Sequence, residues 1–211
     1  SYDENRVVAQ YTTDGGRTYK TVAKCAVIDG VFTFIAPVTG GYRIVVVEGM
    51  KFSDVKQSDW SYNDIDFAAA REVVNGIGNN LYGPKTTLTR AMFVTMLGRI
   101  QGNLGDYDEH TFTDVDKGSW YEKYVSWASH NGIVTGYDAQ HFGPNDSITR
   151  EQMCTMLYRY IKSEGYTAAA GSLERFTDRN LISDWAYEAA SAIESFGIIK
   201  GYDDGSFRPQ S

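Results

Sequence analysis

Apolar and polar residues follow two different patterns along the chain, one before residue 50 and one after it. Before residue 50, short runs rich in Val, Ile, Tyr, Phe and Thr occupy positions 18–28, 31–36 and 41–47. Asp29-Gly30 separates the first two runs, and Asp-Gly between apolar runs is a strong hairpin signal. The pattern predicts a small antiparallel sheet, which a larger upstream β-domain would extend.

After residue 50 the apolar residues recur with a helical period. A stripe at i, i+4, i+7, i+8 and i+11 starts at Trp60, Trp120 and Trp185, and it is weakest at the first. A second stripe, at i, i+3, i+4 and i+7, starts at Phe93 and Met153. Each stripe predicts an amphipathic helix with one apolar face. Glycine-rich turns separate the two kinds of helix.

These elements belong to a repeat. The lead Phe-x-Asp occurs at Phe52 and again at Phe112, and every landmark after it returns at an offset of 60. A third, shortened copy starts at Phe176. Helix-turn-helix repeats bury their apolar faces against their neighbours. We therefore predict a β segment at 1–50 and repeats at 51–110, 111–174 and 175–211.

Composition narrows the classes of function. A net charge of −7 disfavours a general nucleic-acid binder, and no apolar run reaches the length of about 18–20 residues that a membrane helix needs. Cys25 and Cys154 are predicted to be buried thiols. No metal-ligand spacing, Ser/His/Asp order or nucleotide fingerprint is present. We expect no metal, no cofactor and no catalysis.

Two recurring arginines are the most informative polar residues. Thr149 and Gln152 form a capping box, which places Arg150 at the first position of a helix, and Arg90 holds the same position one repeat earlier. A cation there opposes the helix dipole by about 0.3–1 kcal/mol. Two explanations remain open: an ion pair with the aspartate of a repeat lead, or an anion site made by the guanidinium and free helix-start N–H groups.

Other residues recur at matching positions. The tryptophans either pack in the core or stack on a sugar at a groove. The second turn glycines are turn formers that also allow a ligand close to the backbone. The lead aspartates repeat in every copy, as scaffold residues do. The glycines are Gly76, Gly136 and Gly201, and the aspartates are Asp54, Asp114 and Asp178.

Together these motifs resemble the S-layer homology (SLH) domain. The resemblance covers about residues 52–211 and is most complete in the second repeat. Its motifs there are Phe112-Thr-Asp114-Val115, Trp120, Gly132-Ile133-Val134-Thr135-Gly136, Phe142-Gly143-Pro144 and Ile148-Thr149-Arg150. Met92 and Gln152 stand where the family often has Glu.

The resemblance implies a fold and a role. The fold would be a mainly α, pseudo-threefold helical bundle behind the small N-terminal antiparallel β segment. The role would be non-covalent anchoring of a secreted protein at the bacterial cell surface, through inter-repeat grooves that bind cell-wall polysaccharide, often a pyruvylated secondary polymer. Other S-layer subunits are further partners. The implied ligand-binding residues are Arg90, Arg150, Trp60, Trp120, Trp185, Asp54, Asp114, Asp178, Gly76, Gly136 and Gly201.

Three hypotheses make different predictions. An anchoring module should expose grooves in which Arg90 or Arg150 lies beside a tryptophan. A protein-interaction scaffold should pair the recurring Arg and Asp residues with each other and leave mainly apolar patches exposed. The third hypothesis, a carbohydrate-active enzyme with its catalytic domain upstream of Ser1, makes no prediction within these residues.

Overall fold

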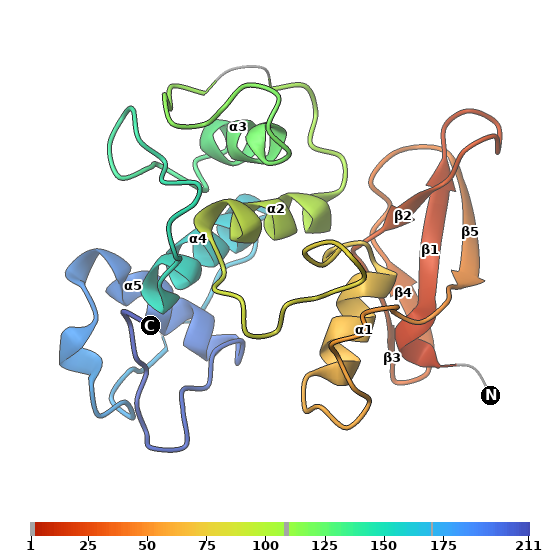
Figure 1. Cartoon of the computed structure of the whole chain (residues 1–211). Helices are drawn as coiled ribbons and strands as arrows, with labels where there is room; N and C mark the ends of the chain where they lie inside the picture. The colour runs from red at the N-terminus through yellow and green to blue at the C-terminus, as the bar shows by residue number, and fades with distance from the viewer. Residues whose placement is uncertain (1–2, 108–109, 170) are drawn as a thin grey trace. The chain divides into compact units, whose positions relative to one another are not determined.

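The computed structural model describes residues 3–107, 110–169 and 171–211, and the chain divides into two compact units (Figure 1). Unit 1 comprises residues 1–87 and 96–105, and unit 2 comprises residues 88–95 and 106–211. Helix α2 (Arg90–Gln101) begins in unit 2 and ends in unit 1. No helix in the described ranges is both long and apolar enough to span a bilayer.

Unit 1 contains the predicted sheet and a strand that the sequence pattern missed. The missed strand, β1 (Val7–Thr12), is the centre of an antiparallel sheet with the order β2-β1-β5. The predicted hairpin is confirmed: Asp29 and Gly30 both have positive φ, 51° and 75°, and join two antiparallel strands. The other strands are β2 (Lys20–Val22), β3 (Cys25–Ile28), β4 (Val31–Phe34) and β5 (Gly41–Val46), and a short 3-10 helix, η1 (Glu4–Arg6), precedes β1.

Two buried charges attach this sheet to the first repeat. Asp66, on helix α1 (Tyr62–Ala70), is 1% exposed and accepts a hydrogen bond from Arg6 Nε at 2.9 Å. Arg71, at the end of the same helix, donates to the carbonyl oxygens of Cys25 at 2.7 Å and Val7 at 3.2 Å. Hydrogen bonds at two buried positions therefore connect the N-terminal segment to the first repeat.

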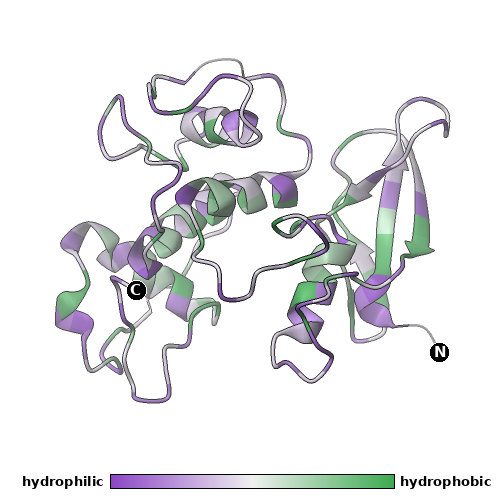
Figure 2. Cartoon of the chain, in the orientation of Figure 1, coloured by the Kyte–Doolittle hydropathy of each residue, from purple (hydrophilic) through white to green (hydrophobic). Residues whose placement is uncertain are grey.

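Unit 2 is built around helices of the second and third repeats. The predicted capping box is confirmed, because Thr149 and Gln152 bond reciprocally at the start of α4. Hydrophilic and hydrophobic positions alternate along these helices, as expected of amphipathic helices (Figure 2). The elements are α3 (Glu122–His130), α4 (Arg150–Ser163), η2 (Arg179–Leu181) and α5 (Asp184–Ser195).

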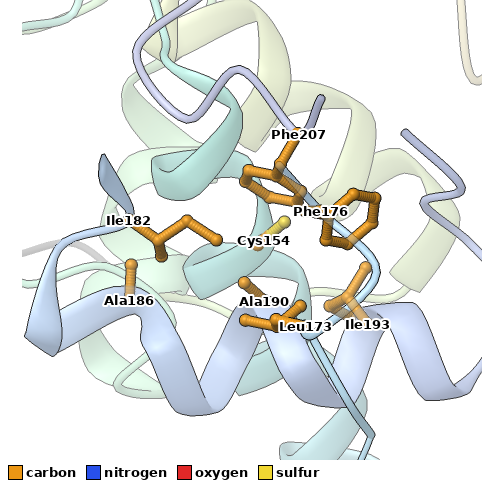
Figure 3. Packing of buried hydrophobic residues seen from close by; sticks show 8 residues of the cluster. All are labelled: Cys154, Leu173, Phe176, Ile182, Ala186, Ala190, Ile193 and Phe207. Carbon is orange, nitrogen blue, oxygen red and sulfur yellow. The ribbon is translucent and has the colours of Figure 1, made fainter. Parts of the chain in front are cut away.

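A closed apolar cluster joins α4 to α5. Cys154 lies at its centre, with the rings of Phe176 and Phe207 on one side and Ala190 and Ile193 of α5 on the other (Figure 3). All five side chains are at most 2% exposed. Both predictions of a buried, unpaired cysteine are confirmed, since Cys25 is also buried and free. Burial raises the pKa of the Cys154 thiol to about 12, so it stays neutral.

The predicted mainly α bundle is wrong. The chain is 30% helical and 13% strand, with antiparallel sheets in its N-terminal quarter. The physical reason is that long segments between the helices, such as 131–148, are held by turns and capped by side chains instead of continuing as helix. The periodic stripes identified five helices in the described ranges but overestimated their share of the architecture.

Candidate binding groove

A groove of about 390 Å³ opens within unit 2, and all three repeats contribute to it. The first repeat supplies Arg90, the second supplies the turn at 134–137 and one face of α4, and the third supplies Trp185. The complete lining is Arg90, Val134, Thr135, Gly136, Tyr137, Gln152, Thr155, Met156, Arg159 and Trp185.

Arg90 forms the cationic end of the groove. Its Nε donates to the carbonyl of Phe142 at 2.8 Å, and its Nη1 donates to Oε1 of Gln152 at 3.1 Å. The guanidinium carbon lies 4.4 Å from the centre of the Tyr137 ring. Although Arg90 is only 3% exposed, no carboxylate in the described ranges lies within ion-pair distance of it. Because a guanidinium has five N–H donors, some remain available to an anion.

The electrostatics of Arg90 favour an anionic ligand. Burial lowers the pKa of its guanidinium, and Tyr137, Asp146 and Asp114 act through space in the opposite direction. An arginine side chain nevertheless stays charged in proteins. A buried guanidinium that has no ion-pair partner among the described residues is costly, and a carboxylate bound to it would offset part of that cost.

The helix-start N–H groups are not free, so that part of the anion-site hypothesis is wrong. The backbone N–H of Arg90 donates to the carbonyl of Asp146, and that of Ala91 donates to Pro144. In the second copy, the N–H groups of Arg150 and Glu151 donate to backbone carbonyls in the same way. An anion at these arginines would therefore meet the side chain and not the helix terminus.

The lead aspartates do not pair with the arginines. Asp114 accepts from the backbone N–H groups of Phe142 at 2.9 Å and Gly143 at 2.8 Å. Burial alone would raise the pKa of Asp114, but these hydrogen bonds outweigh burial and lower it. Asp54 and Asp178 bind the matching backbone groups of their own repeats. The ion-pair explanation for the arginines therefore lacks support.

Arg and Asp instead bind the two backbone polar groups of the same residue. Asp114 binds the N–H of Phe142, while Arg90 of the preceding repeat binds its carbonyl. The next copy repeats this arrangement, since Asp178 and Arg150 bind the N–H and the carbonyl of Phe207. The arginines thus connect each repeat to the next and leave the rest of the guanidinium for other contacts.

The recurring tryptophans lie outside the core. Trp60, Trp120 and Trp185 are 93%, 56% and 57% exposed. Of the three, Trp185 lines the groove, and the other two are absent from its lining. The predicted apolar stripe of α3 was displaced by one residue, because Tyr121, not Trp120, begins the buried face. Core packing therefore does not explain these indoles.

The recurring glycines lie in turns, as the sequence predicted. Gly76, Gly136 and Gly201 have φ values of +70°, +72° and +80°. A Cβ on Gly136 would lie 2.6 Å from the carbonyl oxygens of Asp138 and His141. Gly136 also lines the groove, and the other two do not. The turn therefore requires glycine for local geometry, whatever binds beside it.

The sequence reading missed Tyr137, Gln152 and Arg159 as groove residues. A signal was available for two of them, because Tyr137 recurs as Tyr202 and Arg159 recurs as Arg99 at the repeat offsets. Gln152 was recognised only as a capping residue. No cluster of three potential metal ligands occurs in the described part of the chain.

The fold and the groove define a class: tandem helix-turn-helix repeats in which residues of successive copies line one groove. The sequence profile of the S-layer homology domain matches residues 51–92, 111–154 and 175–211. These matches cover more than half of the chain, and the protein belongs to this family.

Three relatives show the kinds of protein that contain a similar sequence. An exoglucanase, XynX, of Acetivibrio thermocellus is 32% identical over 82% of this chain. S-layer protein sap of Bacillus anthracis is 29% identical over 88%, and a cellulosome-anchoring protein of A. thermocellus is 27% identical over 65%. The matched regions span 16%, 22% and 32% of these relatives, respectively, so the chain resembles only a part of each.

Proposed function

We propose that this chain anchors a surface protein non-covalently to bacterial cell-wall polysaccharide. The observation that carries the proposal is an exposed indole, Trp185, in the same groove as a guanidinium, Arg90, that has no carboxylate partner in the described ranges. Its family membership and the names of its relatives, an S-layer protein and a cellulosome-anchoring protein, support the same role.

The groove suits an acidic sugar. A pyruvate ketal carries a planar carboxylate, which a guanidinium binds through two parallel hydrogen bonds. The apolar face of the sugar ring would lie against Trp185, since indoles combine a large apolar surface with a polar edge. We therefore propose a pyruvylated secondary cell-wall polymer as the ligand and the bacterial cell surface as the location.

Arg150 and the remaining recurring residues extend the proposal to further contacts. Arg150 repeats the Arg90 arrangement, with its guanidinium 4.9 Å from the centre of the Tyr202 ring. Several weak contacts on one chain add avidity along a polymer. Trp60, Trp120 and the glycines Gly76 and Gly201 would serve such contacts, whereas the aspartates position the backbone of each turn.

The scaffold alternative has less support. It requires the recurring Arg and Asp residues to pair, and the aspartates instead bind backbone N–H groups. The enzymatic alternative draws only on the names of much longer relatives. We propose anchoring without catalysis by this chain.

Binding to purified wall sacculi, with and without their secondary polymer, tests the proposal. Trp185→Ala should weaken binding about tenfold without disturbing the fold, because the side chain is exposed. Arg90→Gln should weaken it about a hundredfold, because the ligand carboxylate would lose the buried guanidinium with which we propose it pairs. Arg43→Gln, an exposed arginine outside the groove, is the charge-matched control and should bind like wild type.

Each outcome of this assay is decisive. A circular dichroism melt verifies that the variants are folded, and Trp185→Ala keeps the test valid if Arg90→Gln unfolds. Binding that survives both substitutions, or that persists on sacculi stripped of their polymer, would overturn the proposal.

A further inference from the structure

Arg159 gives the groove a second guanidinium, which the proposed function leaves unused. It lies on α4 and lines the groove together with Arg90. Within the described ranges its side chain makes a single hydrogen bond, from Nη1 to Oγ1 of Thr135 at 3.4 Å, which is long for such a bond. Most of its donors are therefore available to a ligand.

The groove carries no negative charge of its own. None of its described lining residues is Asp or Glu, and Arg90 donates to two neutral acceptors, the carbonyl of Phe142 and the side-chain amide of Gln152. The whole protein, in contrast, has a net charge of −7. Two cations that have no ion-pair partner among the described residues line one groove of an acidic protein, and their local positive potential attracts anions and repels cations.

The two guanidinium groups differ in solvent exposure and in how many hydrogen bonds hold them. Arg90 is buried and fixed by the carbonyl of Phe142 and the amide of Gln152, so it can hold one carboxylate in one geometry. Arg159 is partly exposed and weakly held, so its side chain can follow an anionic group of variable position. Salt should screen the second contact more strongly than the first.

We infer that this groove selects a glycan segment with two acidic groups over one with a single acidic group, and that Arg159 is the specificity-determining residue. The inference rests on the proposed function, because the first acidic group is the ketal carboxylate bound by Arg90. The second is the corresponding group on the neighbouring sugar of the polymer. Such a groove distinguishes glycan polymers by how densely they carry acidic groups, as well as by whether they carry any.

Two synthetic disaccharides that differ only in carrying one or two pyruvate ketals test this inference. Each is titrated into ¹⁵N-labelled protein at low salt while the Trp185 indole N–H resonance is followed, since that indole lines the groove. Wild type should bind the two-ketal probe about tenfold more tightly than the one-ketal probe. Arg159→Gln should bring the two affinities within about threefold of each other and barely change the one-ketal affinity.

Lys162→Gln is the matched control. It removes the same charge from the same helix, but Lys162 is absent from the groove lining and lies 5.7 Å from the Tyr158 ring. This variant should keep the wild-type preference. If Arg159→Gln also keeps it, or if wild type binds both probes equally, the inference is wrong while the proposed function stands. If wild type binds neither probe, the proposed function fails and the inference fails with it.

Discussion

Arg90 occupies the first position of a helix, where a cation is unfavourable. It is stable there because its side chain has a hydrogen-bond partner in the next repeat. The helix dipole opposes a cation there by about 0.3–1 kcal/mol, whereas a charge-assisted hydrogen bond contributes about 1.5–3 kcal/mol. The bond to the carbonyl of Phe142 therefore outweighs the dipole. The sequence revealed that the position was unusual, but the partner is 52 residues away and became visible only in the structure.

Gly136 offers a test at the same scale. Gly136→Ala should destabilise unit 2 by about 2–4 kcal/mol, because the new Cβ would lie 2.6 Å from two carbonyl oxygens in a left-handed turn. Gly132→Ala is the control, since Gly132 has a similar φ of +67° but open space around it. It should cost about 1–2 kcal/mol, the left-handed penalty alone. Equal losses in urea unfolding would contradict the proposed close approach.

At the scale of elements, the sequence predicted where the helices lie better than which of their residues are buried. All five α-helices of the described ranges lie where stripes or caps predicted them. The stripe anchored on Trp120 was displaced by one residue, because the buried positions are Tyr121, the N-cap of α3, and Val125 and Ala128 within the helix. The periodic pattern does not distinguish an aromatic residue in the core from one in a surface groove. Strand β1 was missed because five of its six residues are buried, so that it shows no alternation of buried and exposed positions.

The turn after α3 depends on a carboxylate, which gives it a pH dependence. The folded-state pKa of Asp114 is lowered, since hydrogen bonds from Phe142 and Gly143 outweigh the effect of burial. A depressed pKa contributes stability that is present above the unfolded value of about 4 and is lost as pH falls below it. Asp114→Asn should therefore cost about 1 kcal/mol at pH 7, a value reduced for partial solvent exposure.

Urea unfolding across pH measures this effect. The difference between wild type and Asp114→Asn should shrink as the pH falls from 5 to about 3. Asp116→Asn, which changes an exposed aspartate two residues further along the chain, should change stability by less than about 0.5 kcal/mol at either pH. A difference that stays constant with pH would show that the carboxylate charge is not what holds the turn.

At the scale of the whole molecule, the first repeat is specialised to carry the N-terminal segment. Asp66 and Arg71 are buried charges whose counterparts in the second repeat are Ser126 and Asn131. Both reach residues of the first 50 through Arg6 and the backbone of β1 and β3. The segment is therefore part of the same compact unit as the first repeat.

Arg71→Leu should destabilise unit 1 by about 2–4 kcal/mol, because several backbone carbonyls lose their buried donor together. Hydrogen exchange of the β1 and α1 amides measures the loss. Arg43→Leu is the control: it removes an exposed arginine of β5 and should change protection by less than about 0.5 kcal/mol. Unchanged exchange in Arg71→Leu would mean that the sheet folds independently of the repeat.

The sequence alone determined the repeat, the helices, their caps and the family, because each depends on residues a few positions apart or on a fixed period. Only the tertiary structure decided that no carboxylate among the described residues pairs with Arg90, that the aspartates bind backbone N–H groups, and that Trp185, Gln152 and Arg159 share its groove. Those facts depend on side chains from different repeats meeting in space. Periodicity fixes which face a residue occupies, but not what lies opposite that face.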